Sequence, residues 1–450
     1  MPARPRTRGT DEGEPPSIEW VLAGRAYVNG RLQPVEIGID EEGWIRRVAR
    51  HIDSDRRHDV GEGIVLPSAT DLHVHFREPG DPEASEDLAS GTLQAAYGGV
   101  GTVGEMPNTQ PPITDADRLR DKAARVAGRT HVDVLLYAAL APGVRVASLA
   151  RVAGAFKLYL SPTTGQPEPT RISDASALLA SAAETGLAVS VHAEEPAYFH
   201  DTSRVGTVEG WNAARPAPAE AYAVSELLSV APPSLRLHIA HVTRAEVAAQ
   251  LRRAGQSFET TPHHLLLSDR KGPDARFKVN PPLRSEPERR ELLAVFERGE
   301  VPCLASDHAP HSLDAKRRPF PEAPSGMPGV ETLLPLMLQR VRDGALAFPT
   351  LVAAACDRPA RWAGLPQGRL AVGHRANLLV VDFRRSRSIG ARSLHAPCSW
   401  SAFEGFPAIF PREHYRNGEA LLLDGEYVGR PRGRVVRPDY APGNDPTGPG

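Results

Sequence analysis

The stretch Leu66–Asn108, which begins LPSATDLHVHFREPG and ends EMPN, decides the fold of this chain. Its apolar run ends in alternating residues, so a strand would place His73 and His75 on one face and the apolar residues on the other. Same-face neighbours on a strand lie roughly 7 Å apart, a separation that one divalent cation can bridge. Arg77 follows on the same face and offers a planar fork suited to a carboxylate. Packing could explain the histidines alone, but Arg77 beside them favours a metal site and a small acidic substrate.

The region from about 67 to 367 alternates β-type runs with helical patterns such as SEDLASGTLQAAY and RRELLAVFERG. We expect eight strands, in the runs IVLPSATDLHVHF, VGTVGEM, HVDVLLYAAL, AFKLYL, LAVSVHA, LRLHIAHV, SFETTP and VPCLASD. Such βα repeats over roughly 300 residues favour an α/β fold with a closed (β/α)8 barrel of the TIM type over an open doubly wound sheet. In such barrels the chemistry lies at the C-terminal ends of the strands.

The two ends of the chain have a different sequence pattern from the central region. Residues 18–66 contain short β-type runs with Asn-Gly and Glu-Gly turn signals. Residues 368–438 also contain short β-type runs, with Asn-Gly and Asp-Gly turns. We therefore expect both segments to form one composite β-domain, a small β-sandwich, with the barrel inserted between them. The outermost segments, 1–17 and 439–450, are rich in proline, glycine and charge, and we expect them to be disordered tails.

The composition excludes several classes of protein. A net charge of −2 with 24% charged residues gives no basic excess for nucleic acid or an anionic membrane. Cys303, Cys356 and Cys398 lack metal or redox spacing, which is typical of free thiols in a reducing compartment. The N-terminus has no apolar signal region, and no apolar run is long enough to span a membrane. We therefore expect a soluble cytoplasmic protein.

Polar residues stand near the end of almost every predicted strand, which packing does not explain. They are His73, His75, Arg77, Asn108, Lys157, His192, His241, His263 and Asp307. Lys157 is flanked by apolar residues, and a buried ammonium is unfavourable unless it is neutralised or paired, although it could also extend to the barrel mouth. His192 and His241 could each be structural. Together with His73, His75 and an anionic bridge, they would complete a two-metal site of nitrogen and oxygen ligands suited to zinc.

Asp307, in CLASDHAPH, follows the last predicted strand. Its carboxylate could ligate a metal and shuttle a proton from a water whose pKa the metal lowers, although it could also simply cap a helix. We expect the neighbouring His308 to hold this carboxylate. His238 faces the other side of its strand, and we expect it to be structural. We expect His263 and His264 either to be structural or to support the residues of the site.

At this point the chain resembles the dihydroorotases of the amidohydrolase superfamily, on the lysine-bearing branch of the class that includes the multifunctional pyrimidine enzymes. The matching segments, in the family's order, are DLHVHFREPG, GGVGTVGEMPNTQPP, FKLYL, VHAEE, HIAHVT, TPHHL, KVNPPLR, ASDHAPH and SGMPGVET. GLPQGRLAVGHRANLLVVD and GRVVRP resemble the same family's returning β-domain.

The resemblance implies a reaction and a metal centre. The reaction is the reversible cyclisation of N-carbamoyl-L-aspartate to L-dihydroorotate in de novo pyrimidine biosynthesis, with hydroxide held by two Zn²⁺ ions as the hydrolytic nucleophile. His73 and His75 would hold the more buried zinc, and His192 and His241 the more exposed one. Carboxylated Lys157 would bridge the zinc ions, and Asp307 would be both ligand and catalytic acid/base.

The resemblance also implies a substrate pocket. Arg77, Asn108 and His311 would hold the substrate carboxylate, Asn280 and the Ser325–Gly326 backbone would contact the ring amides, and Thr163 falls where relatives have a mobile loop. The sequence departs from some relatives at two positions. Many single-function bacterial relatives have aspartate where Lys157 stands, and Ala240 stands where others have a cysteine, so we expect no additional metal there.

Other interpretations stay open. Dihydropyrimidinase, hydantoinase and allantoinase share the histidine, lysine and aspartate pattern, but Arg77 with Asn108 argues against the first two, whose substrates need no ring carboxylate. An inactive dihydroorotase-like subunit that supports aspartate transcarbamoylase would be expected to lack metal ligands, and this chain has all of them. A homodimer and a complex with aspartate transcarbamoylase are both compatible with an active enzyme.

Overall fold

The computed structural model describes residues 17–80, 85–164 and 167–440. The tails expected at 1–17 and 439–450 therefore lie outside the described residues, apart from residues 17, 439 and 440. Among the described residues, we find no helix with the length and apolar character needed to cross a bilayer.

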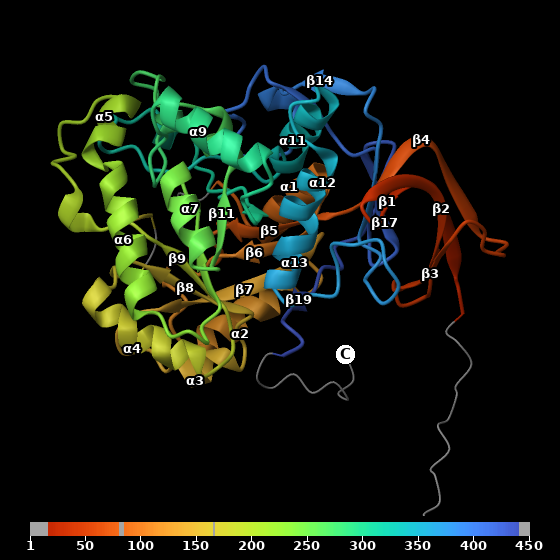
Figure 1. Cartoon of the computed structure of the whole chain (residues 1–450), viewed down its shortest axis with the longest axis horizontal. Coiled ribbons are helices and arrows are strands. Elements are labelled where there is room, and N and C mark those ends of the chain that lie inside the picture. Colours follow the sequence, from red (N-terminus) through yellow and green to blue (C-terminus); the bar gives the residue numbers. More distant parts are fainter. Residues whose placement is uncertain (1–16, 81–84, 165–166, 441–450) are drawn as a thin grey trace, which may run out of the picture.

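Within the described ranges, eight parallel strands follow one another in chain order around a barrel (Figure 1). They are β5 (Ala69–Val74), β6 (Val100–Glu105), β7 (Asp133–Leu140), β8 (Ala155–Tyr159), β9 (Val189–His192), β10 (Leu237–Ile239), β11 (Ser257–Thr260) and β12 (Cys303–Leu304). A parallel bridge between Val74 and His308 joins the last strand's continuation to the first strand, and the His75 N–H donates to the His308 carbonyl at 2.7 Å. The predicted (β/α)8 fold is confirmed, and each predicted run contains one barrel strand; the first run also contains the end of β4 (Arg57–Pro67).

Helices surround these strands (Figure 1). The α-helices are α1 (Leu88–Gly98), α2 (Ala116–Val126), α3 (Val146–Ala150), α4 (Ile172–Ala183), α5 (Val208–Ala214), α6 (Ala217–Val230), α7 (Ala245–Arg253), α8 (Pro262–Leu266), α9 (Glu286–Glu297), α10 (Leu313–Lys316), α11 (Leu333–Arg342), α12 (Phe348–Val352) and α13 (Arg358–Trp362). Short 3-10 turns are η1 (Pro196–Tyr198), η2 (Ala275–Phe277) and η4 (Ala391–Ser393), and η3 (Ala353–Asp357) is a π-helix. Helix α1 shows how local sequence sets the ends of a helix. Asp87 and Ser90 form a capping box at its start, and Gly99 ends it with φ 79°.

The barrel strands are buried on both faces, as parallel strands covered by helices should be. Every residue of β5 to β9 is buried. An apolar cluster that includes Leu72, Tyr137 and Trp362 packs along these strands. The polar side chains discussed below gather at the C-terminal ends of the strands, which we call the barrel mouth.

The two ends of the chain meet in a second sheet, which we call the terminal sheet; Figure 1 labels β1 to β4 and β17 in this part of the molecule. Its order is β18 (Glu426–Tyr427), β17 (Glu419–Leu423), β16 (Glu413–Arg416), β13 (Leu378–Val381), β4 (Arg57–Pro67), β1 (Trp20–Val28), β2 (Arg31–Ile39) and β3 (Ile45–Ala49). Strands β4 and β13 are antiparallel, with Val65 opposite Val380. This sheet has its own apolar core, which includes Leu22, Ile37 and Leu378.

Two parts of 368–438 do not join the terminal sheet, so the predicted composite domain is wrong for them. Strand β19 (Val435–Val436) pairs in parallel with β7 of the barrel. Strand β7 pairs with β8 only from Tyr137 onward, which leaves its first residues able to accept β19. Strands β14 (Ser386–Ser388) and β15 (Pro407–Ile409) form a separate pair, and β15 packs against α11.

Candidate active site

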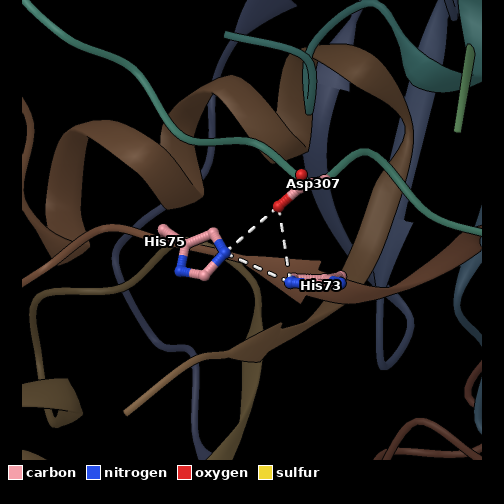
Figure 2. Close-up of side chains that lie close together, drawn as sticks. All are labelled: His73, His75 and Asp307. Carbon is pink, nitrogen blue, oxygen red and sulfur yellow. Dashed lines mark hydrogen bonds and ion pairs between the residues drawn. The ribbon is translucent and has the colours of Figure 1, made fainter. Parts of the chain in front are cut away.

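His73, His75 and Asp307 form a compact cluster at the barrel mouth (Figure 2). His73 lies in β5, His75 directly follows that strand, and Asp307 follows β12. The two Nε2 atoms of the histidines lie 3.1 Å apart. Asp307 Oδ1 lies 3.1 Å from His75 Nε2 and 3.4 Å from His73 Nε2. All three side chains are buried, and their ligand atoms lie within 4.8 Å of one another, so they can converge on one cation.

Lys157, His192 and His241 complete the arrangement. Lys157 Nζ, on β8, lies 3.5 Å from His73 Nε2. His192 Nδ1 and His241 Nε2 lie 3.0 Å apart, which gives a second pair of converging imidazole nitrogens. The structure brings all of the predicted metal residues into the lining of one cavity.

The electrostatics of this cluster suit a bound cation. Burial lowers the pKa of His73 to about 4, and burial also lowers the pKa values of His192 and His241. These imidazoles are therefore neutral near pH 7, and neutral imidazole is the form that ligates a metal. Burial alone would raise the pKa of Asp307, but the surrounding histidines lower it well below its usual value. Neutral nitrogens beside an ionised carboxylate form a donor set that fits a divalent metal ion.

The backbone is strained at three positions of the site. Arg77, His241 and Asp307 have φ angles of 55°, 38° and 47°, in the left-handed region that L residues avoid. Such conformations cost on the order of 1–3 kcal/mol each and persist where the surrounding structure imposes them. At the barrel mouth, they direct one cationic and two ligand-type side chains into a shared space.

Arg77 and His311 contact each other beside the cluster. Arg77 Nη1 donates to the Pro310 carbonyl at 2.7 Å, and Arg77 Nη2 lies 3.2 Å from His311 Nε2. The same His311 nitrogen lies 3.0 Å from the Ser325 carbonyl. The Trp400 indole donates to the His311 carbonyl at 2.8 Å, so the chain's C-terminal part also fixes this loop.

The other predicted substrate residues line the cavity: Asn108, Thr163, Asn280, Ser325 and Gly326. Asn108 Oδ1 accepts from His75 Nδ1 at 2.6 Å, while its Nδ2 donates to the Thr164 carbonyl at 3.0 Å. Asn280 Oδ1 accepts from the Trp211 indole at 3.2 Å. Asn108 therefore orients a histidine and also holds the segment that carries Thr163.

Two buried lysines that the sequence analysis missed anchor the segment before Gly326. Lys316 Nζ donates to the carbonyls of Pro324 and Gly326, both at 2.8 Å. Lys278 Nζ donates to the carbonyls of Phe320 and Ala323, both at 2.8 Å. Gly326 has φ 134°, and a Cβ there would lie 2.4 Å from the Ala309 carbonyl oxygen. This position therefore requires glycine.

His308 does not hold Asp307, so that prediction is wrong. Its Nε2 bonds Glu86, and its Nδ1 accepts from the backbone N–H groups of Gly329 and Val330. With both ring nitrogens engaged, His308 joins two loops behind the site. Tyr159, which the sequence analysis also missed, lines the cavity, and its buried hydroxyl has no hydrogen-bond partner among the described residues.

Two buried glutamates were also overlooked, because each looks like an ordinary residue of a strand or strand end. Glu259, in β11, lies 2.5 Å from His73 Nδ1. Glu194, which follows β9, lies 2.8 Å from His192 Nε2. His238, expected to be structural, contacts Glu259 and Ser257. The motif VHAEE contains Glu194, but its spacing from His192 was the only available signal.

The fold and this side-chain arrangement define a class of protein. A model of the amidohydrolase family matches residues 64–406, and the chain belongs to this family. Its curated relatives include the dihydroorotase of Halobacterium salinarum, which is 36% identical over 93% of this chain and 99% of that protein. The dihydroorotase of Thermoplasma volcanium is 33% identical over 94% of this chain and 99% of that protein. The dihydroorotase of Archaeoglobus fulgidus is 32% identical over 89% of this chain and 96% of that protein.

Solved structures share the architecture at lower identity. The L-hydantoinase (dihydropyrimidinase) from Arthrobacter aurescens superposes with a TM-score of 0.87 and 24% identity, over 94% of this chain and 100% of that chain. The dihydropyrimidinase from Brevibacillus agri gives a TM-score of 0.85 and 20% identity, over 93% and 98%. At these identities the similarities concern the fold alone, whereas the sequence relatives above are 32% to 36% identical.

Proposed function

We propose that this protein is a zinc-dependent dihydroorotase that interconverts N-carbamoyl-L-aspartate and L-dihydroorotate in de novo pyrimidine biosynthesis. The observation that carries the proposal is Arg77, in contact with His311, in the same cavity as His73, His75 and Asp307. A guanidinium there matches a ring carboxylate, which dihydroorotate has and which dihydrouracil and hydantoin lack. The dihydroorotases named above, which match over nearly their full length, support the same substrate.

The proposed metal centre contains two zinc ions. His73 and His75 would hold one and His192 and His241 the other, with Asp307 as a further ligand and carboxylated Lys157 as the bridge. When bound, the zinc ions would lower the pKa of a water molecule and polarise the ring carbonyl. Burial lowers the pKa of Lys157 to about 8, so part of this amine is neutral near pH 7. Only the neutral amine reacts with carbon dioxide, which supports the proposed carbamate.

We assign the side chains of the site separate roles in proton transfer and in substrate binding. In the hydrolytic direction, Asp307 would take a proton from the attacking water and deliver it to the amide nitrogen as the ring C–N bond breaks. Arg77, Asn108 and His311 would hold the carboxylate, so that the reacting carbon stays aligned. Asn280 and the Ser325–Gly326 backbone would contact the ring amides, and the segment with Thr163 would lie over the substrate. Ring closure reverses the proton transfers.

The location and the oligomeric state of the enzyme are also part of the proposed function. We propose that it works in the cytoplasm on a small-molecule substrate, with the barrel at about 67–367 carrying the chemistry. A homodimer and an assembly with aspartate transcarbamoylase are both compatible with the proposal. Size measurement with and without that enzyme would separate these two states from a monomer.

The proposal is tested by ultraviolet-monitored hydrolysis with zinc-loaded protein prepared in bicarbonate. L-Dihydroorotate, dihydrouracil, hydantoin and allantoin are compared, with Arg77→Met as the variant and Arg57→Met, on the terminal sheet, as the matched control. We expect turnover confined to dihydroorotate, lost in Arg77→Met and retained in the control. Preferred turnover of a neutral ring would replace this function with that of another cyclic amidase. Absence of all turnover despite two bound zinc ions would favour a supporting subunit without activity.

A further inference from the structure

The proposed metal-binding histidines differ in what holds the ring nitrogen that points away from the site. His73 presents Nε2 to His75 and Asp307, and its Nδ1 lies 2.5 Å from Glu259 Oε1. His192 presents the other nitrogen, Nδ1, to His241, and its Nε2 lies 2.8 Å from Glu194 Oε2. A glutamate therefore occupies the far side of one histidine in each half of the site, although the two rings are turned in opposite senses.

Each glutamate is held by a partner of a different kind. Glu259 Oε2 lies 3.1 Å from His238 Nε2, and His238 Nδ1 lies 2.8 Å from Ser257 Oγ. This chain of contacts ends inside the barrel wall, on β10 and β11. The His238 imidazole therefore holds Glu259 Oε2, and the Ser257 hydroxyl in turn contacts that imidazole.

Glu194 is instead held by Arg215, which bonds both carboxylate oxygens. The guanidinium also donates to Ser161 Oγ at 3.2 Å and to the Pro162 carbonyl at 3.3 Å. It packs against the Phe199 ring, with its central carbon 4.3 Å from the ring centroid. Arg215 thus joins Glu194 to the residues that precede Thr163.

A buried carboxylate beside an imidazole determines which nitrogen carries the proton. Because a carboxylate only accepts, the facing nitrogen must be N–H, and the opposite nitrogen keeps its lone pair for a metal. In both histidines the nitrogen left with the lone pair is the one that faces the site. Both glutamates are buried, so solvent does not compete for these contacts.

We propose that Glu259 and Glu194 are positioning residues, each of which orients one histidine of a different metal position, with Arg215 fixing Glu194. The proposal rests on the proposed two-metal site. It assigns Glu259 to the His73 and His75 position and Glu194 to the His192 and His241 position. Carboxylates that orient metal-binding histidines typically change metal affinity 10- to 100-fold when removed.

The experiment measures zinc affinity at each position in wild type, Glu259→Gln and Glu194→Gln. Glutamine preserves the side-chain volume but removes the charge and offers an N–H as well as an acceptor. Metal-free protein is titrated with zinc against a chelator, and anomalous diffraction at the zinc edge, at several zinc concentrations, gives the occupancy of each position. We expect each variant to weaken its own position by about 10- to 100-fold and the other by less than about threefold.

Glu220→Gln is the matched control. Glu220 is also a buried glutamate, 3.7 Å from Arg284 and bonded to the Thr243 N–H at 2.9 Å, but it contacts none of the proposed ligands. A general effect of altering a buried glutamate would appear in this variant as well. We expect Glu220→Gln to lower stability while leaving both zinc affinities unchanged.

A second readout is independent of activity and of bound metal. Imidazole ¹⁵N shifts of the metal-free protein should report N–H at His73 Nδ1 and at His192 Nε2, and a mixture of tautomers only in the matching variant. If a glutamine variant does not fold, His238→Gln and Arg215→Lys leave the glutamates in place and should weaken the same positions by a smaller factor.

Three outcomes would overturn the proposal: unchanged affinities in both variants, equal weakening at both positions, or the opposite tautomers in wild type. The proposed function fails separately. Wild-type protein that turns over no dihydroorotate contradicts that function, while the position-specific zinc affinities and tautomers still decide the roles of the glutamates. Wild-type protein that binds no zinc contradicts both.

Discussion

The barrel mouth and the terminal sheet place some of their charged groups in different surroundings. In the sheet, Glu36 accepts from Arg57 and from the Ile52 N–H, both at 2.6 Å, and the Arg57 hydrogen bond lowers its pKa to about 2. At the mouth, burial lowers the pKa of His73 to about 4 and that of Lys157 to about 8. The Arg57 ion pair thus stabilises the charged form of Glu36, whereas burial at the mouth disfavours the charged forms of His73 and Lys157. Glu36 and Arg57 therefore neutralise each other without a ligand, whereas the mouth holds His73 as the neutral base that a metal ion needs.

The two regions also differ in how they depend on packing. The terminal sheet has its own apolar core around residues such as Leu378. The mouth combines buried polar groups with left-handed backbone at Arg77, His241 and Asp307. Strain and buried polar groups of this kind usually reduce stability in favour of function. Substitutions in the two regions should therefore separate activity from stability.

The largest expected effect is that Asp307→Asn loses activity, whereas Leu378→Ala loses stability. Loss of the proposed acid/base should lower kcat by about 10²- to 10⁴-fold with little loss of Tm. Loss of a buried leucine should cost about 2–5 kcal/mol of unfolding free energy, while the folded fraction keeps its kcat. Steady-state kinetics and denaturant unfolding measure both variants. Equal losses of stability in the two variants would contradict the division between mouth and sheet.

A second prediction concerns acid and His414, a terminal-sheet histidine whose Nδ1 donates to the Ala96 carbonyl at 2.8 Å. Burial lowers its pKa from 6.5 to about 4, so between these values the unfolded chain takes up a proton that the folded chain does not. Its effect is absent above pH 6.5, and stability is lost as pH falls toward 4, by about 3 kcal/mol.

His414→Gln keeps a donor for the Ala96 carbonyl but cannot titrate. Unfolding by urea between pH 7 and pH 4 should therefore give a shallower decline for the variant than for wild type. Because the mouth histidines are the same in both proteins, the difference between the two curves isolates His414. Parallel curves would mean that His414 titrates alike in both states.

The smallest of the three effects is that of the metal on stability. Zinc at 100 times its dissociation constant should raise unfolding free energy by about 2.7 kcal/mol per site. The increment should be the same in Leu378→Ala, because effects at distant sites add. Thermal unfolding with zinc and with chelator measures both proteins. An increment that disappears in Leu378→Ala would show that the terminal sheet and the mouth are coupled.

The sequence predicts most of the barrel, because buried parallel strands appear as short apolar runs and catalytic polar residues follow them. Alternation alone places His73 and His75 on one face of a strand, although it does not by itself indicate a metal site. The roles of Glu259 and Glu194 were not readable, because Glu259 meets a histidine 186 positions away and Glu194 depends on ring orientation. Contacts between distant parts of the chain are also the reason why the pairing of β19 with β7 could not be predicted. The apolar residues of β19 indicate a strand, but they do not indicate its partner.

The error at His308 has a similar cause. Adjacency to Asp307 suggested a contact, but adjacent residues often point in different directions, and Asp307 has left-handed backbone. His308 instead reaches Glu86 and the Gly329 N–H, which local sequence does not bring near it. Adjacency in the sequence therefore indicates which residues lie near the site, but not which side chains contact each other.

The most direct test of the account is a zinc-edge anomalous diffraction map of protein prepared with zinc and bicarbonate. We predict two zinc positions, one contacted by His73 and His75 and the other by His192 and His241, with a carbamate on Lys157 between them. A single position, or an unmodified Lys157 with no second zinc, would contradict the central claim that the barrel mouth is organised around two metal ions.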